Sequence, residues 1–266
     1  MSSIAEIYTE AIHSNLKPLY GNWPPDQPLQ LGDYGVLRDS TFIRLANIGD
    51  AGLAIKFSKL QSGSKNQEYF TSKEGVEVSF NAKGDGPVPS GVKANASMSI
   101  SFSNSEAVFF NAAGCEFWTI SDKNALAKAI MALYGRGNGL WKREWVVVTD
   151  LIKTGSATVV VSGGDSSAIT LEAAANVTAI DLANVDLKLS LAHEKSIGYR
   201  IISDQSGLTP LMGLSQIQGD WNPFHDPAFT PRSYALMDKR ISRVIEEAPE
   251  IKTEQSPDEL RFRHLN

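Results

Sequence analysis

The stretch Ala96-Ser-Met-Ser-Ile-Ser-Phe-Ser103 alternates apolar or small side chains with serine along its whole length. Because successive side chains of a β-strand point to opposite faces, this pattern predicts a strand with one apolar and one hydroxyl face. Val76, Val78 and Phe80 show the same period of two, and residues 84–91 between the two runs are rich in glycine and proline. We therefore expect two amphipathic strands joined by a loop.

A second block of the same kind begins at residues 156–161, where Ala, Val and Val recur at every second position. The sequence Ser-Gly-Gly-Asp at 162–165 then predicts a turn. We expect a second long hairpin here, with residues 169–171 and the alternating run 185–191 as its partner segments. Residues 199–201 predict a closing strand.

Helical patterns flank these blocks. Apolar residues recur at helical spacing over 4–12, and Pro18 marks the end of that helix. A second helix is expected over 122–134, with Ser121 as its N-cap and the glycine-rich residues 135–139 as its terminator.

The fold class that follows is α+β. We expect a twisted, mostly antiparallel β-sheet with amphipathic hairpins, flanking helices and a C-terminal helical tail. Composition changes after Ile217, so residues 1–218 are expected to form the main domain and 219–266 a tail. Met237, Ile241 and Val244 mark one amphipathic helix within that tail.

The totals exclude some classes of protein. The 266 residues include 25 Lys and Arg against 30 Asp and Glu, a net charge of -5, which argues against a nucleic-acid partner. Cys115 is the single cysteine, so no intramolecular disulfide is possible and a reducing, cytoplasmic location is expected. The sequence shows no signal-peptide pattern and no apolar run of about 18 residues that would predict a membrane helix.

No catalytic or metal-binding pattern is recognisable. The four histidines are scattered without ligand spacing, and no base accompanies Cys115 in the sequence. Gly135-Arg-Gly-Asn-Gly139 follows a helix and precedes a strand, the reverse of the order that directs backbone amides at a phosphate. We therefore expect no enzyme activity, no metal and no cofactor.

The two amphipathic blocks, Val76–Phe110 and Ala157–Leu191, suit two kinds of structure. Ordinary antiparallel sheets with one buried face alternate in this way. Membrane-spanning β-strands also alternate, over about nine to eleven residues, with one face toward lipid and the other toward water.

Residues 124–153 carry a family resemblance. They combine a helix, the glycine turn at 135–139 and a strand that contains Val147-Val-Thr-Asp-Leu151, placed before the second hairpin. Together with the closing strand at Gly198-Tyr-Arg-Ile201, this order resembles the pore-forming domain of gasdermins, of the bacterial type, loosely over residues 70–217.

The resemblance implies a pore-forming protein that is held inactive in the cytoplasm and moves to the inner membrane on activation. Membrane lipid, an activating protease and further copies of the chain would be its partners, and cell death in antiphage defence its role. The implied membrane-inserting residues are Val76, Val78, Phe80, Met98, Ile100, Phe102, Val159, Val161, Val185, Leu187, Leu189 and Leu191. The implied contacts of an inhibitory tail are Trp221, Phe224, Met237, Ile241 and Val244.

Two other interpretations stay open. A non-enzymatic binding or scaffold module with a two-faced β-sheet explains the same alternation without any refolding. An enzyme whose site is assembled from residues distant in the sequence would leave no local motif, and a deep polar cleft would be its structural sign.

Overall fold

Antiparallel strands and two helices make up the structure, a computed structural model that describes residues 2–50, 52–53, 56–60, 66–71, 75–81, 97–136, 140–173, 189–203, 207–218 and 228–231. The strand pairs found among these residues are all antiparallel, as the alternating patterns predict. The predicted tail helix lies outside the described residues.

Among the described residues the larger sheet has 11 strands, and its central path runs in the order β1-β14-β9-β8-β10-β13. These strands are β1 (Tyr20–Gly21), β14 (Leu208–Gln218), β9 (Trp145–Thr154), β8 (Val108–Ile120), β10 (Ser156–Ser162) and β13 (Ile197–Ser203). The remaining members are β2 (Asp33–Arg38), β3 (Thr41–Asn47), β4 (Phe57–Leu60), β5 (Asn66–Thr71) and β15 (Ala228–Pro231).

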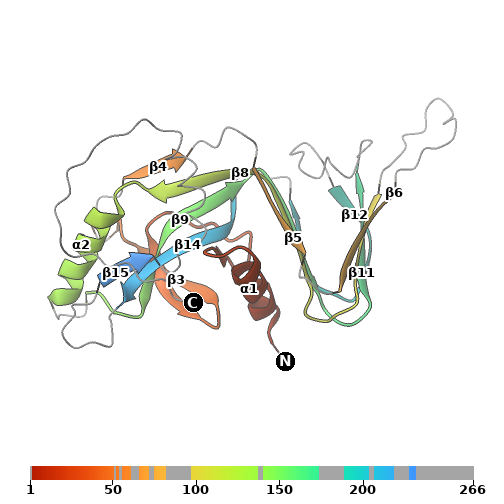
Figure 1. The fold of residues 1–266 in the computed structure, drawn as a ribbon, viewed down its shortest axis with the longest axis horizontal. Helices are drawn as coiled ribbons and strands as arrows, with labels where there is room; N and C mark the ends of the chain where they lie inside the picture. Colours follow the sequence, from red (N-terminus) through yellow and green to blue (C-terminus); the bar gives the residue numbers. More distant parts are fainter. Residues whose placement is uncertain are drawn as a thin grey trace.

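The smaller sheet has four strands in the order β12-β11-β7-β6. They are β12 (Leu189–Lys195), β11 (Ser167–Ala173), β7 (Ser97–Phe102) and β6 (Val76–Asn81). Figure 1 shows this sheet, labelled β11 and β12, folded back beside the strand labelled β5, so that the two sheets meet at the bottom like the arms of a V.

Strand β8 is long enough to serve two parts of the larger sheet. Its C-terminal part pairs with β9 and β4, and its N-terminal part pairs with β10 and β5. The chain bends between these parts at Gly114, whose φ of 63° is a left-handed conformation that suits glycine. Nearby, the Gly155 amide donates to the Ala113 carbonyl at 2.9 Å, where β9 ends and β10 begins.

Helix α1 (Ile4–Asn15) begins with a capping box. The Ser3 side chain accepts from the Glu6 amide at 3.2 Å, and the Glu6 carboxylate accepts from the Ser3 amide at 2.6 Å. These bonds satisfy amides that lack partners within the helix. The N-terminal helix predicted from the apolar spacing is thereby confirmed.

Helix α2 (Lys123–Gly135) is also present as predicted, but its cap differs by one residue. The N-cap is Asp122 rather than Ser121, because the Asp122 carboxylate accepts from the Ala125 amide at 2.8 Å. Lys123 then ties the helix to β9, where its ammonium lies 2.7 Å from both oxygens of the buried Asp150.

Strand β15 connects the C-terminal part of the chain to the larger sheet. Its residues 228–231 pair with residues 215–218 of β14, on the same edge of β14 that β1 occupies further along. The chain beyond residue 219 therefore includes a segment that is hydrogen-bonded to the sheet.

Candidate membrane-inserting hairpins

Two long hairpins lie side by side and cross from one sheet to the other. The first consists of β5–β6 and β7–β8, and the second of β10–β11 and β12–β13. The first arm, β5-β8-β10-β13, and the second arm, β6-β7-β11-β12, carry these chain segments in the same order. We call the turning point between the arms the corner, formed by Gly75, residues 103–107, residues 163–166 and Ser196.

The pairing of the second hairpin differs from the prediction. Residues 156–162 pair with β13 and β8, whereas residues 169–171 belong to β11, which pairs with β12 and β7. The segment 169–171 is thus a continuation of the same hairpin side and not its partner. The closing strand predicted around 199–201 is the actual partner of β10.

An apolar cluster fills the space between the arms. Met98, Ile100 and Phe102 of β7 are at most 3% exposed and pack with Ile169 and Leu171 of β11. Phe109 and Val160 face them from the first arm, and Val76 and Val78 of β6 are partly buried against the same cluster. The apolar face predicted for residues 96–103 is therefore a buried face in this structure.

The opposite face of the second arm is polar. Ser99 of β7 and Thr170 of β11 are register partners, and their hydroxyls lie 3.2 Å apart. Ser101 is exposed on this side, and the Ser190 hydroxyl of β12 donates to the Glu172 carbonyl at 3.3 Å. A row of hydroxyl groups thus crosses the second arm on the side away from the apolar cluster.

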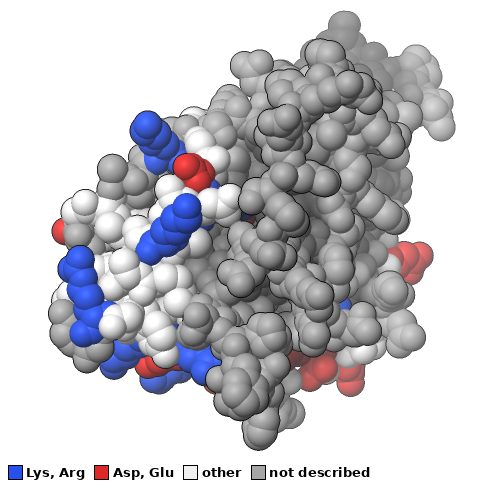
Figure 2. All heavy atoms as spheres, turned by 60° about the vertical axis from the view of Figure 1, so that its left-hand side comes forward, with Lys and Arg blue, Asp and Glu red and all other residues white. Residues whose placement is uncertain are grey.

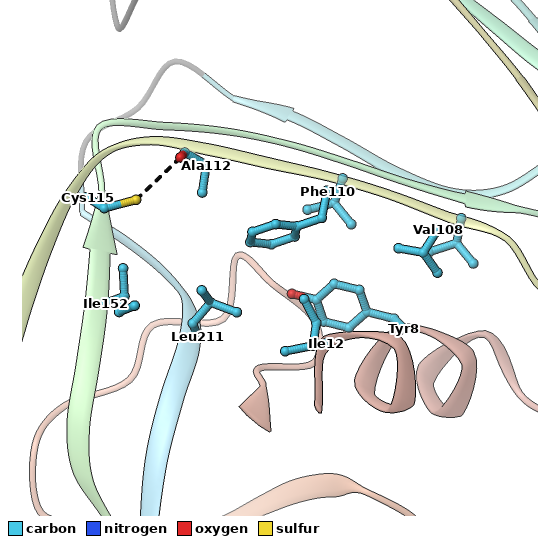
Figure 3. Packing of buried hydrophobic residues seen from close by; sticks show 10 residues of the cluster. Tyr8, Ile12, Val108, Phe110, Ala112, Cys115, Ile152 and Leu211 are labelled. Atoms are coloured by element: carbon cyan, nitrogen blue, oxygen red, sulfur yellow. Dashed lines mark hydrogen bonds between the residues drawn. The ribbon is translucent and has the colours of Figure 1, made fainter. Parts of the chain in front are cut away.

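Helix α1 covers the other face of the first arm. Tyr8 and Ile12 of the helix are fully buried, and Figure 3 shows both side chains directed at Val108 and Phe110 of β8. Val159 and Val161 of β10 belong to the same cluster. The first arm is therefore a middle layer, with α1 on one face and the second arm on the other.

Three aromatic side chains attach α1 to the second hairpin. The Trp23 ring lies 5.6 Å from that of Tyr8 and 4.5 Å from that of Tyr199 on β13, between ring centroids. Burial, with a smaller contribution from Tyr199, raises the pKa of Tyr8 well above its ordinary value. Burial and then Asp26 raise the pKa of Tyr199 to about 12.

In each hairpin, buried residues on opposite sides of the folded chain belong to the same alternating series of positions, all even or all odd. On the first hairpin, the even-numbered Met98, Ile100 and Phe102 lie between the arms, and the even-numbered Val108 and Phe110 lie against α1. These are opposite sides of the folded chain, because the corner at 103–107 shifts the alternation by one position. A strand running straight through the corner with regular alternation would carry all five side chains on one face.

The second hairpin has the same property. Val159 and Val161 lie against α1, and Ile169 and Leu171 lie between the arms, yet all four have odd numbers. Straightening would again unite them on one face, while Phe109 and Val160 would fall on the other. The shared odd numbering of these four residues can be read from the sequence. The sequence does not show, however, that the chain passes from the first arm to the second at residues 162–166.

The remaining predicted residues are distributed as follows. Leu191 of β12 is 38% exposed. Phe80 and Leu189 belong to β6 and β12, and their side chains are not among those the structure describes. The predicted positions that lie outside the described residues are Val185, Leu187, Trp221, Phe224, Met237, Ile241 and Val244.

Within the described residues, no group of His, Cys, Asp and Glu could hold a metal ion. Cys115 is buried, and its thiol lies 3.4 Å from the Ala112 carbonyl oxygen. No helix among the described residues has the length and apolar character needed to cross a bilayer.

Surface charge is unevenly distributed despite the net charge of -5. Figure 2 shows that Lys and Arg predominate over Asp and Glu on the described surface at the α2 side. Lys128, Arg136 and Lys142 are among the exposed basic residues of this region. The overall acidic balance therefore does not describe each face of the molecule.

Comparison with known proteins gives matches among solved structures alone. No protein-family model matches the sequence, and no curated protein matches it. Among solved structures, the chain is similar to the cryo-EM structure of the Gasdermin A3 membrane pore, with 8% sequence identity and a TM-score of 0.35. That match covers 87% of this chain and 94% of the other.

Proposed function

We propose that this chain is a pore-forming protein, and that the structure described here is its bent form before insertion. The observation that carries the proposal is the shared alternation across the corner in both hairpins. In an extended form, β7–β8 and β10–β11 would each run straight through the corner. Each would then present one apolar face to lipid and one hydroxyl-rich face to water, as membrane β-strands require. The sequence resemblance to gasdermins points in the same direction.

The strand order supports assembly from identical copies. β6 and β12 are the two edges of the second arm, and its four strands alternate in direction. When copies are placed edge to edge, β6 of one meets β12 of the next in antiparallel orientation. Because a membrane sheet must leave no backbone group unpaired, such copies would close into a ring in lipid.

Activation by removal of the C-terminal tail is part of the proposal. Tail residues 228–231 pair with β14, so cutting the chain after 218 removes this strand, whereas cutting after 231 retains it. The membrane lipid is the proposed target, with the cytoplasm and the inner membrane as the two locations. Cell death in antiphage defence is the biological role that the family resemblance implies.

The test is dye release from vesicles of phosphatidylethanolamine and phosphatidylglycerol. Four samples are compared: the full chain, the full chain nicked by a broad-specificity protease, a chain ending at Gln218 and one ending at Pro231. We expect release only after nicking or truncation, and release from the chain ending at Pro231 would locate the restraint beyond β15. If both truncated chains retain native circular dichroism but release no dye, the pore function is wrong and a binding or scaffold module is favoured.

A further inference from the structure

The corner of the second hairpin contains a buried pair of hydroxyls. Ser162 at the end of β10 and Ser167 at the start of β11 are each 1% exposed, and the Ser162 hydroxyl donates to that of Ser167 at 3.1 Å. Ser162 also lies 2.8 Å from the Gly164 carbonyl oxygen, and Ser167 lies 2.7 Å from the Ser196 carbonyl oxygen. The pair therefore joins the two sides of the hairpin where it turns.

Proton counting limits how these contacts are satisfied. Each hydroxyl has one proton to donate, so the two serines can donate two hydrogen bonds at a time. Besides each other, they face two acceptors, the Gly164 and Ser196 carbonyl oxygens, because Ser167 also reaches Gly164. Both protons are used when the Ser162 hydroxyl donates to Ser167 and the Ser167 hydroxyl donates to the Ser196 carbonyl oxygen. Because the two hydroxyls are buried, leaving the oxygen of either serine without a hydrogen-bond partner costs free energy.

Two backbone hydrogen bonds extend the ladders of β10 to the point where the chain turns. The Ser162 amide donates to the Ala107 carbonyl at 2.9 Å, and the Gly163 amide donates to the Ser196 carbonyl at 3.0 Å. The backbones approach closely at this point, since a Cβ on Gly163 would lie 2.7 Å from the Gly198 nitrogen. Glycine at 163 thus permits the close crossing.

Left-handed residues accompany these contacts. Ser166 has a φ of 63° and Ser196 a φ of 53°, a conformation unfavourable for residues with a Cβ. Both side chains are exposed, so no core packing depends on them. A straight strand would return both residues to the extended region, and the bent form alone carries this strain.

We propose that the hydroxyl pair Ser162–Ser167 forms a latch that holds the second hairpin bent against the strain of the left-handed Ser166 and Ser196. The buried hydrogen bonds favour the bent form, and the two strained serines oppose it. The latch thereby sets how readily the corner opens. The link from opening to membrane damage rests on the proposed function, whereas the opening itself does not.

Substitutions at the same two positions should act in opposite directions. Ser166→Gly with Ser196→Gly removes the strain and should reduce corner opening about tenfold. Ser166→Val with Ser196→Val increases the strain, because a β-branched side chain strongly disfavours positive φ, and should increase opening. Ser167→Ala removes the central hydroxyl and should increase opening about fivefold.

The chain offers a matched control in the turn between β2 and β3. Ser40 there is also left-handed, with a φ of 59°, but lies outside the corner. Ser40→Gly and Ser40→Val should change the melting temperature in the same directions as the corner variants. They should leave corner opening unchanged.

Opening is measured on the full chain in solution by hydrogen exchange of a peptide spanning residues 162–168. In the bent form the Ser162 and Gly163 amides donate to the Ala107 and Ser196 carbonyls, which protects them from exchange. We expect exchange to be slowest in the double glycine variant, faster in the wild type, and fastest in the double valine and Ser167→Ala variants. Equal exchange in all corner variants, or the same changes in the Ser40 variants, would overturn the latch.

Dye release by the nicked full-length variants separates the latch from the function. Release rates in the same order as exchange would support both proposals. If exchange follows the expected order while no protein releases dye, the latch is supported and the pore function fails. If the wild type releases dye at a rate that none of the corner variants alters, corner opening does not control insertion and the latch has no regulatory role.

Discussion

Replacing Glu106 by Leu tests the shared apolar face most directly. Residues 103–106 at the corner are all exposed in the bent form, so a leucine at any of them meets mainly water. In a straight strand, Glu106 would fall on the side of Phe102 and Val108, whereas Ser105 would fall on the hydroxyl side. Glu106→Leu and Ser105→Leu are therefore matched in the bent form and different only in the extended one.

The expected size of the effect comes from two contributions. Moving one leucine side chain from water to lipid contributes about 1.5–3 kcal/mol. Glu106 lies between Phe102 and Val108 on the shared apolar face, and removing an acidic side chain from a lipid-facing position contributes less than the about 2–4 kcal/mol of a basic residue at the midplane. Allowing for incomplete burial, we expect a total of about 2 kcal/mol, or about thirtyfold in membrane partition.

The assay is the concentration of nicked protein that gives half-maximal dye release. Glu106→Leu should lower this concentration about thirtyfold, and Ser105→Leu should leave it unchanged or raise it. Urea unfolding should show both variants within about 0.5 kcal/mol of the wild type, as for other surface substitutions. The shared face would be refuted if both leucine variants lowered the half-maximal concentration equally, or if a folded Glu106→Leu protein did not lower it.

Three further predictions concern the folded state. Lys123→Met should lower the free energy of unfolding in urea by about 3 kcal/mol, because Asp150 would remain as a buried carboxylate without its cation. Adding Asp150→Asn should recover part of this loss. Losses of the two substitutions that simply add would contradict the prediction. Ile12→Ala should cost about 3 kcal/mol of unfolding free energy through the cavity left under the first arm, and a loss below that of a surface change would contradict the packing. The contribution of Tyr8 and Tyr199 to stability should be constant below about pH 10 and fall as the pH rises toward 12, because the pKa of Tyr199 is raised to about 12 and that of Tyr8 is raised as well. In the double Tyr8→Phe, Tyr199→Phe variant, the urea concentration at the unfolding midpoint should fall less between about pH 10 and pH 12 than in the wild type.

Local patterns were sufficient to locate the two described helices and about half of the described strands, whereas the long β8 and β14 carry no pattern that predicts them. The alternation at 96–103 corresponds to β7, and the apolar spacing at 4–12 corresponds to α1. These patterns are readable because a strand or a helix imposes its period on neighbouring residues. The cap of α2 was misplaced by one residue because serine and aspartate at 121 and 122 are both good N-caps.

The candidate site was only partly predictable. Met98, Ile100 and Phe102 were recognised as one apolar face, but what covers that face depends on the second arm folding back onto the first. The sequence pattern predicts 169–171 as the partner of β10, because those residues are the next apolar run along the chain. A period of two specifies which face is apolar, but it does not specify which strand pairs with which.

The C-terminal part shows the same limit. The composition change near 219 predicts a tail over 219–266, and within that range residues 228–231 form β15 on the edge of β14. Four residues are too few for a periodic pattern to stand out. Their strand conformation depends on an edge supplied by residues 215–218, and therefore on the assembled sheet.

The amino-acid sequence by itself determined the two-faced character of the hairpin strands, the existence of helices near 4–12 and 122–134, and the absence of an intramolecular disulfide. Tertiary structure alone decided that Val108 and Phe110 are buried against α1 while Phe102 is buried between the arms. The physical reason is one of range. Alternation follows from the backbone geometry of adjacent residues, whereas the corner depends on contacts such as that of Ser167 with Ser196, which exist only after distant strands have paired.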